Sequence, residues 1–146
     1  MTGSLPMLMQ ASAVAIGGRA VLLTGEPGAG KSSLALALID RGAVLIGDDG
    51  VTLTAKSGTL FATPPPNIGG LLEVRGVGLI RMKTAQAPVG LLVSLAGDDA
   101  AKAERLPDKL PDTQLSEIAV PTLHISRPDW TSTMRIERAL EMHGLA

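Results

Sequence analysis

The chain has 146 residues, of which 45% are hydrophobic and 18% charged, and its formal net charge is −1. We expect one domain over 1–146 with no basic surface for nucleic acid, and the absence of cysteine excludes disulfides and thiolate metal sites. Because no apolar stretch reaches membrane-spanning length and the start lacks the basic residues of a signal peptide, we expect a cytoplasmic protein with no membrane partner.

The first elements in chain order are two strands and a helix. Residues 12–16, followed by two glycines, predict a strand and a tight turn. Residues 20–24 are rich in branched apolar side chains and predict a buried strand, and 33–41 is a run of strong helix formers. Gly42 is positioned to end that helix.

A phosphate-binding loop pattern, G-x-x-x-x-G-K-[ST], lies between the strand predicted over 20–24 and the helix predicted over 33–41. Its glycines let backbone N–H groups turn toward phosphate oxygens, its lysine reaches the terminal phosphates, and its serine hydroxyl is a ligand for Mg²⁺. The N-terminus of the helix adds positive charge. The pattern predicts a bound nucleotide, and its residues are Gly25, Glu26, Pro27, Gly28, Ala29, Gly30, Lys31 and Ser32.

Two adjacent carboxylates follow the next predicted strand. Residues 43–47 are apolar, and Asp48 and Asp49 come directly after them, which is a plausible Walker-B position. One carboxylate can support a metal ion while the other accepts a proton from a substrate hydroxyl. Adjacent side chains on a strand point to opposite faces, so the two cannot act alike. We favour Asp49 as the base, with Asp48 as the alternative.

The middle of the chain predicts a hairpin and a candidate site. Residues 51–60 alternate around a Lys-Ser-Gly turn, and the prolines within 63–67 interrupt regular structure. Residues 71–80 mix charged side chains and glycines with apolar ones, which is unusual for a plain core. In this run, Glu73, Arg75 and Gly76 suit an approach of the backbone to phosphate better than a salt-bridged strand end with a bulge.

The last part of the chain predicts two strands and a helix. Residues 89–95 and 120–125 read as buried strands, separated by a polar surface loop over 97–112 in which Asp98 and Asp99 form a turn or cap a helix. Residues 129–142 have the spacing of an amphipathic helix. We expect His124 to be a packed rather than a ligating histidine and His143 to be exposed. We favour a core position for Trp130, with an anchor in a protein interface as the alternative.

Taken in order, these motifs resemble the catalytic domain of HPr kinase/phosphorylase. The resemblance rests on the loop at 25–32, on Arg41-Gly42, on the Asp48-Asp49 pair and on the run Glu-Val-Arg-Gly-Val-Gly at 73–78. It spans most of the chain and corresponds to a short form without an additional N-terminal domain. It implies an α/β fold, a P-loop-containing mixed sheet with flanking helices, similar to the nucleotide core of phosphoenolpyruvate carboxykinases.

The resemblance also implies an activity and a partner. Members of the family use ATP and Mg²⁺ to phosphorylate a serine of HPr, a small phosphocarrier protein, and many remove the phosphoryl group again with inorganic phosphate. Family members assemble into hexamers, so a homo-oligomer is expected here too. The alternatives that remain are a small-molecule kinase on the same core and a nucleotide-binding regulatory module with weak or lost catalysis.

Residue roles follow from the same resemblance. Phosphoryl transfer requires positioning and neutralisation of charge, which the loop backbone, Lys31 and a Mg²⁺ ion held by Ser32 would supply. The glutamate that completes the metal site in the family corresponds to Glu73, and a carboxylate is a suitable hard ligand. Arg105 matches an arginine that stabilises charge on the transferred group, with a solvated loop arginine as the alternative.

Three positions depart from the family pattern. A histidine common before the first strand is replaced by Gln10, which cannot exchange protons near neutral pH. Arg81 stands where an amide is common, and the late basic loop linked to the phosphorolysis direction is recognisable only at 126–130. The sequence therefore leaves the reverse reaction open.

Overall fold

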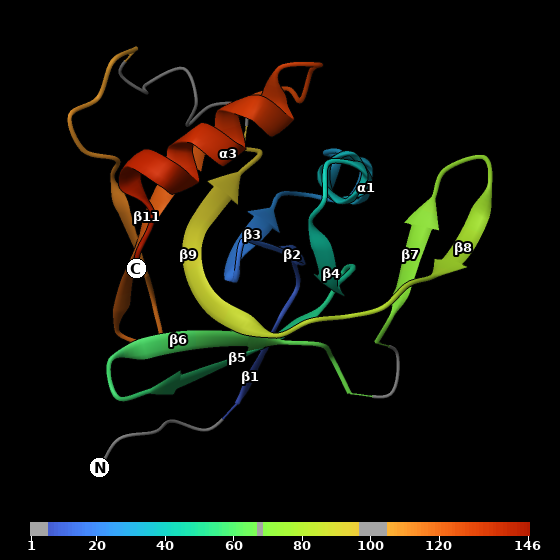
Figure 1. Ribbon diagram of the computed structural model, residues 1–146, viewed down its shortest axis with the longest axis horizontal. Helices are drawn as coiled ribbons and strands as arrows, with labels where there is room; N and C mark the ends of the chain where they lie inside the picture. The colour runs from blue at the N-terminus through green and yellow to red at the C-terminus, as the bar shows by residue number, and fades with distance from the viewer. Residues whose placement is uncertain (1–5, 67–68, 97–104) are drawn as a thin grey trace.

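A curled mixed sheet with helices on one face forms the body of the molecule (Figure 1). The computed structural model describes residues 6–66, 69–96 and 105–146. Within them the largest sheet has nine strands. Its main path runs in the order β1 (Met7–Met9), β5 (Val51–Lys56), β6 (Thr59–Thr63), β9 (Ala87–Ser94), β3 (Arg19–Thr24), β2 (Ser12–Ile16) and β4 (Val44–Gly47), and β10 (Asp112–Leu115) and β11 (Ile118–His124) extend it from β9.

Strand β9 produces the curl of the sheet (Figure 1). Its first residues pair with β6 in antiparallel fashion, through Ala87 and Pro88. Its later residues pair in parallel with β3 on one side and with β11 on the other. The curved strand thus joins an antiparallel part of the sheet to a parallel part that includes β3, the strand before the phosphate-binding loop. The aspartates follow β4, which pairs with β2 in antiparallel fashion.

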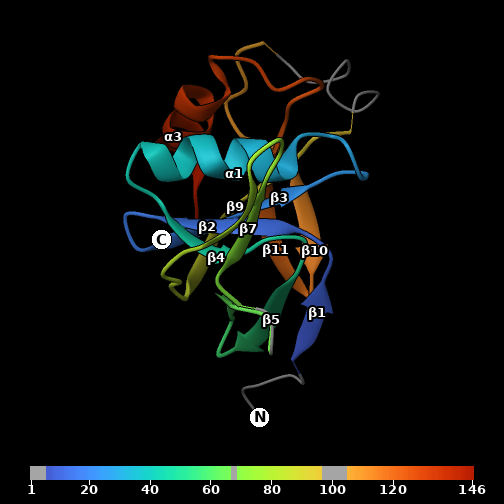
Figure 2. The same cartoon turned by 90° about the vertical axis from the view of Figure 1, so that its right-hand side faces the viewer.

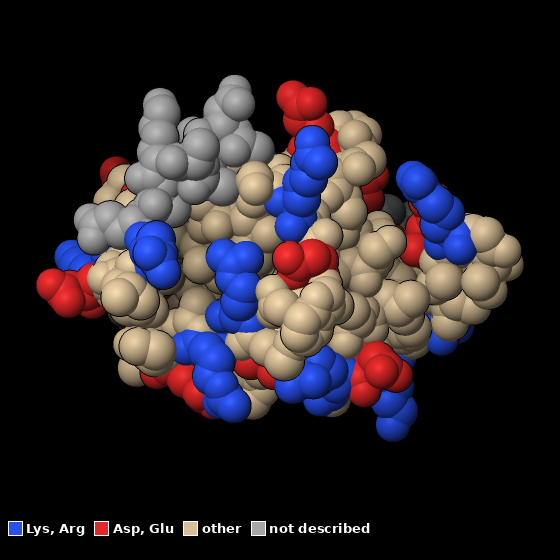
Figure 3. Space-filling model, turned by 90° about the horizontal axis from the view of Figure 1, so that it is seen from above, with Lys and Arg blue, Asp and Glu red and all other residues tan. Residues whose placement is uncertain are grey.

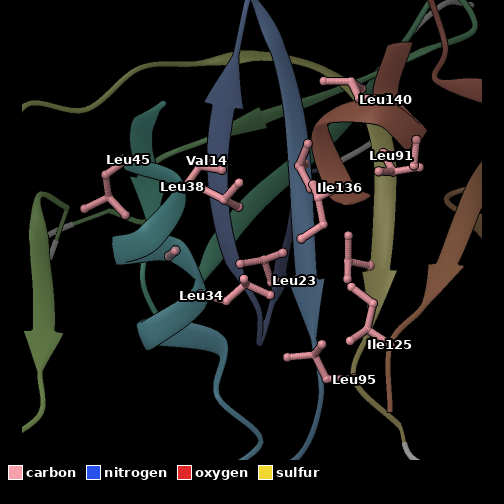
Figure 4. Packing of buried hydrophobic residues seen from close by; sticks show 14 of the residues in the cluster. Val14, Leu23, Leu34, Leu38, Leu45, Leu91, Leu95, Ile125, Ile136 and Leu140 are labelled. Atoms are coloured by element: carbon pink, nitrogen blue, oxygen red, sulfur yellow. The ribbon is translucent and has the colours of Figure 1, made fainter. Parts of the chain in front are cut away.

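Helices α1 (Lys31–Asp40) and α3 (Ser132–His143) cover one face of the sheet, with α1 lying above β2 (Figure 2) and α3 packed on β9 and β11. Between them and the sheet lies a core of aliphatic side chains that includes Leu23, Leu38 and Ile136 (Figure 4). Ala20, Leu22 and Leu92 pack instead in a second cluster on the opposite face. Strand β3 is buried on both faces between its ends, which explains why its four middle residues, 20–23, are all apolar.

The segment 71–80, in which charged residues and glycines are mixed with apolar ones, lies in a separate two-stranded hairpin, β7 (Leu71–Val74) and β8 (Gly78–Arg81). The hairpin extends from the body at one side of the molecule (Figure 1) and contacts α1 through β7. Leu72 is buried against the core, whereas Val77 and Leu79 are exposed. Charged residues and glycines are therefore compatible with apolar neighbours here because most of this hairpin is surface.

Most predicted elements are confirmed, with shifts at their ends. The predicted mixed α/β fold is present, the helix predicted over 33–41 begins at Lys31, and the last helix begins at Ser132. Strand β10 was not predicted. The expectation for Trp130 was wrong, because this side chain is 83% exposed. His143 is half-buried rather than exposed, and the turn predicted at Asp98 and Asp99 lies outside the described residues.

Candidate active site

The phosphate-binding loop connects the carboxyl end of β3 to α1, where ligands bind in open α/β sheets. Lys31 is only 9% exposed, and its ammonium donates a hydrogen bond to the Gly25 carbonyl oxygen at 2.6 Å, which holds the side chain across the loop. Gly30 has a φ of 105°, and a Cβ atom there would lie 3.3 Å from Pro128. The segment predicted as the late basic loop therefore packs directly on the phosphate-binding loop.

A tight turn after β4 brings the two aspartates to the same place. A Cβ atom on Gly47 would lie 2.0 Å from the Gly50 carbonyl oxygen, so only glycine allows this turn to close. Between these glycines, Asp48 is half-buried and Asp49 is exposed. The predicted Walker-B position is thus adjacent to Ser32, whose hydroxyl donates a hydrogen bond to Asp48 Oδ1 at 2.6 Å.

Asp48 links three segments of the chain through its carboxylate. Oδ1 accepts hydrogen bonds from the hydroxyls of Ser12, at 2.9 Å, and Ser32. Oδ2 accepts one from the backbone N–H of Glu73, at 3.0 Å. Strand β2, the phosphate-binding loop and the β7–β8 hairpin are therefore held together by one side chain, which leaves Asp48 little freedom to approach a substrate.

Asp49 differs in both backbone and side chain. Its φ is 58°, a left-handed conformation that is uncommon for residues other than glycine. Its backbone N–H donates a long hydrogen bond, 3.4 Å, to the Ser12 hydroxyl. Within the described residues its carboxylate accepts no hydrogen bond. Of the two candidates, Asp49 is the one whose carboxylate is free in the cleft.

These residues line a common cleft of about 300 Å³. Five charged side chains face it, two cationic and three anionic, and Gln10, at the position of the family histidine, faces it as well. The predicted site residues in the lining are Pro27, Gly28, Gly30, Lys31, Ser32, Asp48, Asp49, Glu73 and Arg75. The predicted phosphate, metal and proton-transfer groups are therefore neighbours.

Some predicted site residues lie elsewhere. Arg105 lines a groove beside α3 and β11 that also includes His124 and His143, and not the cleft. Gly76 lies in the turn of the β7–β8 hairpin, where the Val77 N–H donates to the Val74 carbonyl. The roles predicted for Arg105 and Gly76 remain predictions. Gly25, Glu26 and Ala29 belong to the loop without lining the cleft.

The oxygen atoms that line the cleft suit Mg²⁺, which takes part of its ligands from phosphate and water, better than a metal ion whose ligands all come from the protein. Within the described residues, no group of three or more His, Cys, Asp or Glu side chains is arranged to hold a metal ion. Mg²⁺ is usually held by one or two carboxylates together with phosphate oxygens and water. Ser32 and Glu73, which line the cleft, fit that requirement when a nucleotide phosphate and water supply the other oxygens.

Sequence reasoning missed Ser12, which contacts both aspartates. Its side chain is fully buried, in a strand that is otherwise apolar. A buried hydroxyl requires a hydrogen-bonding partner, so a serine among alanines and valines points to a polar neighbour. That pattern could have identified a buried contact but not its partner, because the aspartates are far away in the sequence.

Comparison with known proteins identifies the class to which this fold and cleft belong. The family model of the HPr serine kinase C-terminal domain matches residues 5–143. A solved structure titled as the Hpr(Ser) kinase/phosphatase from Coxiella burnetii is 27% identical, with a TM-score of 0.79 over 92% of this chain and 88% of that one. The fold and the cleft define a P-loop domain of the kinase type, and the chain belongs to the HPr serine kinase C-terminal domain family.

Sequence relatives support the same family. HPr kinase/phosphorylase of Shouchella clausii is 39% identical over 123 residues, which cover 74% of this chain and 40% of the relative. The protein of that name in Clostridium botulinum strain Eklund 17B is 49% identical over 67 residues, covering 46% of this chain and 22% of the relative. The chain thus spans less than half the length of these relatives. None of its described helices is long and apolar enough to cross a membrane.

Proposed function

We propose that this domain is an ATP- and Mg²⁺-dependent kinase that transfers the γ-phosphoryl group of ATP to a serine of an HPr-like phosphocarrier protein. The observation that carries the proposal is the shared cleft: the phosphate-binding loop, Glu73 and the two aspartates line one space. Membership of the family supports the choice of HPr as the acceptor. Asp49 is exposed, so a serine on the surface of a protein acceptor can reach it from solvent.

In this proposal the chain binds the donor through its loop. Backbone N–H groups of 25–32 and the Lys31 ammonium contact the phosphates, and Arg75 faces the same space from β7–β8. Bound Mg²⁺ would neutralise charge on the phosphate oxygens, with Ser32 and Glu73 as ligands and Asp48 holding the Ser32 hydroxyl in place.

Asp49 is the proposed general base. Its carboxylate accepts the proton of the acceptor serine while the serine oxygen forms a bond to the γ-phosphorus and the bond to the ADP oxygen breaks. The proton is returned by Asp49 in the reverse direction, in which inorganic phosphate would take the phosphoryl group from phosphorylated HPr. Because Gln10 lines the cleft where relatives carry a histidine, we expect the forward direction to be the faster one.

A transfer assay tests the proposal. The protein is incubated with γ-labelled ATP, Mg²⁺ and HPr from the same organism, and label on an HPr serine is the expected result. Label on a metabolite instead would indicate a small-molecule kinase. Nucleotide binding without transfer to HPr or to any protein of a cell extract would contradict the proposal in favour of a regulatory module. Addition of phosphate to phosphorylated HPr measures the reverse reaction.

Assembly belongs to the same proposal. The family resemblance noted above implies a hexamer. In the β7–β8 hairpin, the apolar side chains of Val77 and Leu79 are 72% and 67% exposed. Apolar side chains gathered on one surface are typical of protein interfaces. Light scattering on the purified protein is expected to give a mass several times that of one chain, and a monomer at micromolar concentration would contradict it.

A further inference from the structure

We propose that Ser12 is a positioning residue that fixes the positions of both aspartates of the cleft relative to the phosphate-binding loop. The inference rests on the proposed function in one respect, because its kinetic consequence is measured as the rate of phosphoryl transfer. Its structural consequence can be measured without any activity. No motif of the phosphate-binding loop or of the 73–78 run includes this residue.

The geometry fixes the direction of both hydrogen bonds. Asp48 Oδ1 has no proton when ionised, so the single hydroxyl proton of Ser12 is donated to it, across 2.9 Å. The Asp49 backbone N–H can only donate, so the Ser12 oxygen accepts it, across 3.4 Å. One hydroxyl therefore contacts the side chain of one aspartate and the backbone of the next, and its capacity to donate is used in full.

The surroundings of Ser12 offer no other reason for a hydroxyl. Its side chain is 0% exposed, and Ala11, Ala13 and Val14 beside it are buried and apolar. A buried hydroxyl without a partner is destabilising, whereas alanine at this position would match its neighbours. The serine is thus explained by the two aspartates rather than by the packing of β2.

Strand β2 is a rigid base for this contact. Ser12 pairs with Leu23 in β3, two residues before the phosphate-binding loop, and the next residue, Ala13, pairs with Gly47 immediately before the aspartates. Ser12 thus stands between the two segments whose relative position determines the site. Without its hydroxyl, Asp48 keeps its bonds to Ser32 and Glu73, but the left-handed backbone of Asp49 loses the hydrogen bond on its N–H.

The test compares Ser12→Ala with Thr122→Val. Thr122 is also buried, at 3% exposure, and its hydroxyl bonds to Thr113 and to the Val120 carbonyl, away from the cleft. Both variants delete one buried hydroxyl, so both are expected to lower the melting temperature. Only Ser12→Ala is expected to lower kcat for transfer to HPr, by about 10- to 100-fold, with KM for ATP within about twofold, because a displaced base costs rate rather than binding.

Amide hydrogen exchange supplies the readout that does not need activity. In the parent protein the Asp49 N–H is expected to be protected, and Ser12→Ala is expected to speed its exchange at least tenfold relative to Thr122→Val. Ser12→Cys fills nearly the same space with a weaker hydrogen-bonding group and serves if the alanine variant folds poorly. Unchanged exchange at Asp49 would overturn the inference. A kcat within twofold of the parent would overturn it as well, whereas a parent without transfer activity contradicts the proposed function alone.

Discussion

At the scale of single residues, Asp48 and Asp49 show how two adjacent carboxylates acquire different tasks. Asp48 accepts hydrogen bonds from Ser12, Ser32 and the Glu73 backbone, whereas the Asp49 carboxylate is exposed to the cleft. The place of the pair could be predicted from the apolar strand before it. Which carboxylate is free could not, because the answer depends on partners that lie 36, 16 and 25 residues away.

Asp49→Asn is expected to lower kcat by about 10²- to 10⁴-fold, because an amide cannot accept the serine proton. ATP binding is expected to persist, since the carboxylate forms no hydrogen bond with the phosphate-binding loop, all of whose residues the structure describes. Kinetics with HPr and a nucleotide titration measure the two effects. Asp48→Asn is the matched comparison and is expected to weaken binding of Mg·ATP too. Retention of full kcat by Asp49→Asn would remove it from the role of base.

Gly47→Ala is expected to destabilise the protein by roughly 2–4 kcal/mol, because its methyl group would lie 2.0 Å from the Gly50 carbonyl oxygen. The turn that carries the aspartates would have to open, so the variant that remains folded should also lose transfer activity. Urea unfolding monitored by circular dichroism gives the change in free energy of unfolding. A stability within 0.5 kcal/mol of the parent, about the effect of an ordinary surface change, would contradict this account of the turn.

At the scale of elements, α1 and α3 are joined at the surface by an ion pair between Arg41 and Glu137, 2.8 Å apart. Hydrogen bonding and the charge of Arg41 lower the pKa of Glu137, despite its partial burial. Basic and acidic side chains are interspersed over the face that carries α3 (Figure 3). The pair links the C-terminal end of α1 to α3, and α1 starts in the candidate site.

A pH dependence of stability follows from the lowered pKa of Glu137. The stabilisation is present above the pKa that this carboxyl has in the unfolded chain and is lost as the pH falls through the lower value of the folded state. Glu137→Gln is therefore expected to lower the melting temperature slightly at pH 7 and not at pH 3. Glu141→Gln is the control, because Glu141 forms an ion pair with Arg138 on the same helix and is more exposed than Glu137. An equal effect of Glu137→Gln at both pH values would contradict the prediction.

Elements were predictable wherever local pattern decides. The apolar run of β3, the helix after the loop and the hairpin of β5 and β6 all follow from the spacing of their own side chains. Trp130 shows the limit of that reasoning. Composition suggested a core position for the only tryptophan, but the segment before α3 packs on the phosphate-binding loop through Pro128 and leaves the indole in solvent.

At the scale of the whole molecule, the phosphate-binding loop lies at the carboxyl end of β3, a strand that pairs in parallel with β9, and leads into α1. Trp130 lies in the same region and lines a surface groove with Gly30 and Ser33. The order of strands was not predictable, because pairing of β9 with β3 and β11 joins segments distant in sequence. Only the presence of a mixed α/β sheet was predicted, and it was implied by the family resemblance that the motifs carry.

Binding of Mg·ATP is expected to change the fluorescence of Trp130, the only tryptophan, and to stabilise the folded state by about 2.7 kcal/mol at 100 times its Kd. A titration and a thermal melt measure both effects on the intact protein. Lys31→Ala is expected to weaken both responses, because its ammonium reaches the phosphates. Identical melting with and without Mg·ATP would contradict nucleotide binding at this loop.

The curved strand β9 also has a consequence for the order in which the chain folds. Strand β3 forms a local hairpin with β2 on one edge. Its other edge pairs with β9, where Thr24 is opposite Ser94, so this second pairing requires a segment 70 residues later in the chain. Contacts this distant in sequence form slowly, because a long loop must close first. We expect the β2–β3 hairpin to appear early during synthesis, and the phosphate-binding loop to become rigid only after β9 has joined the sheet.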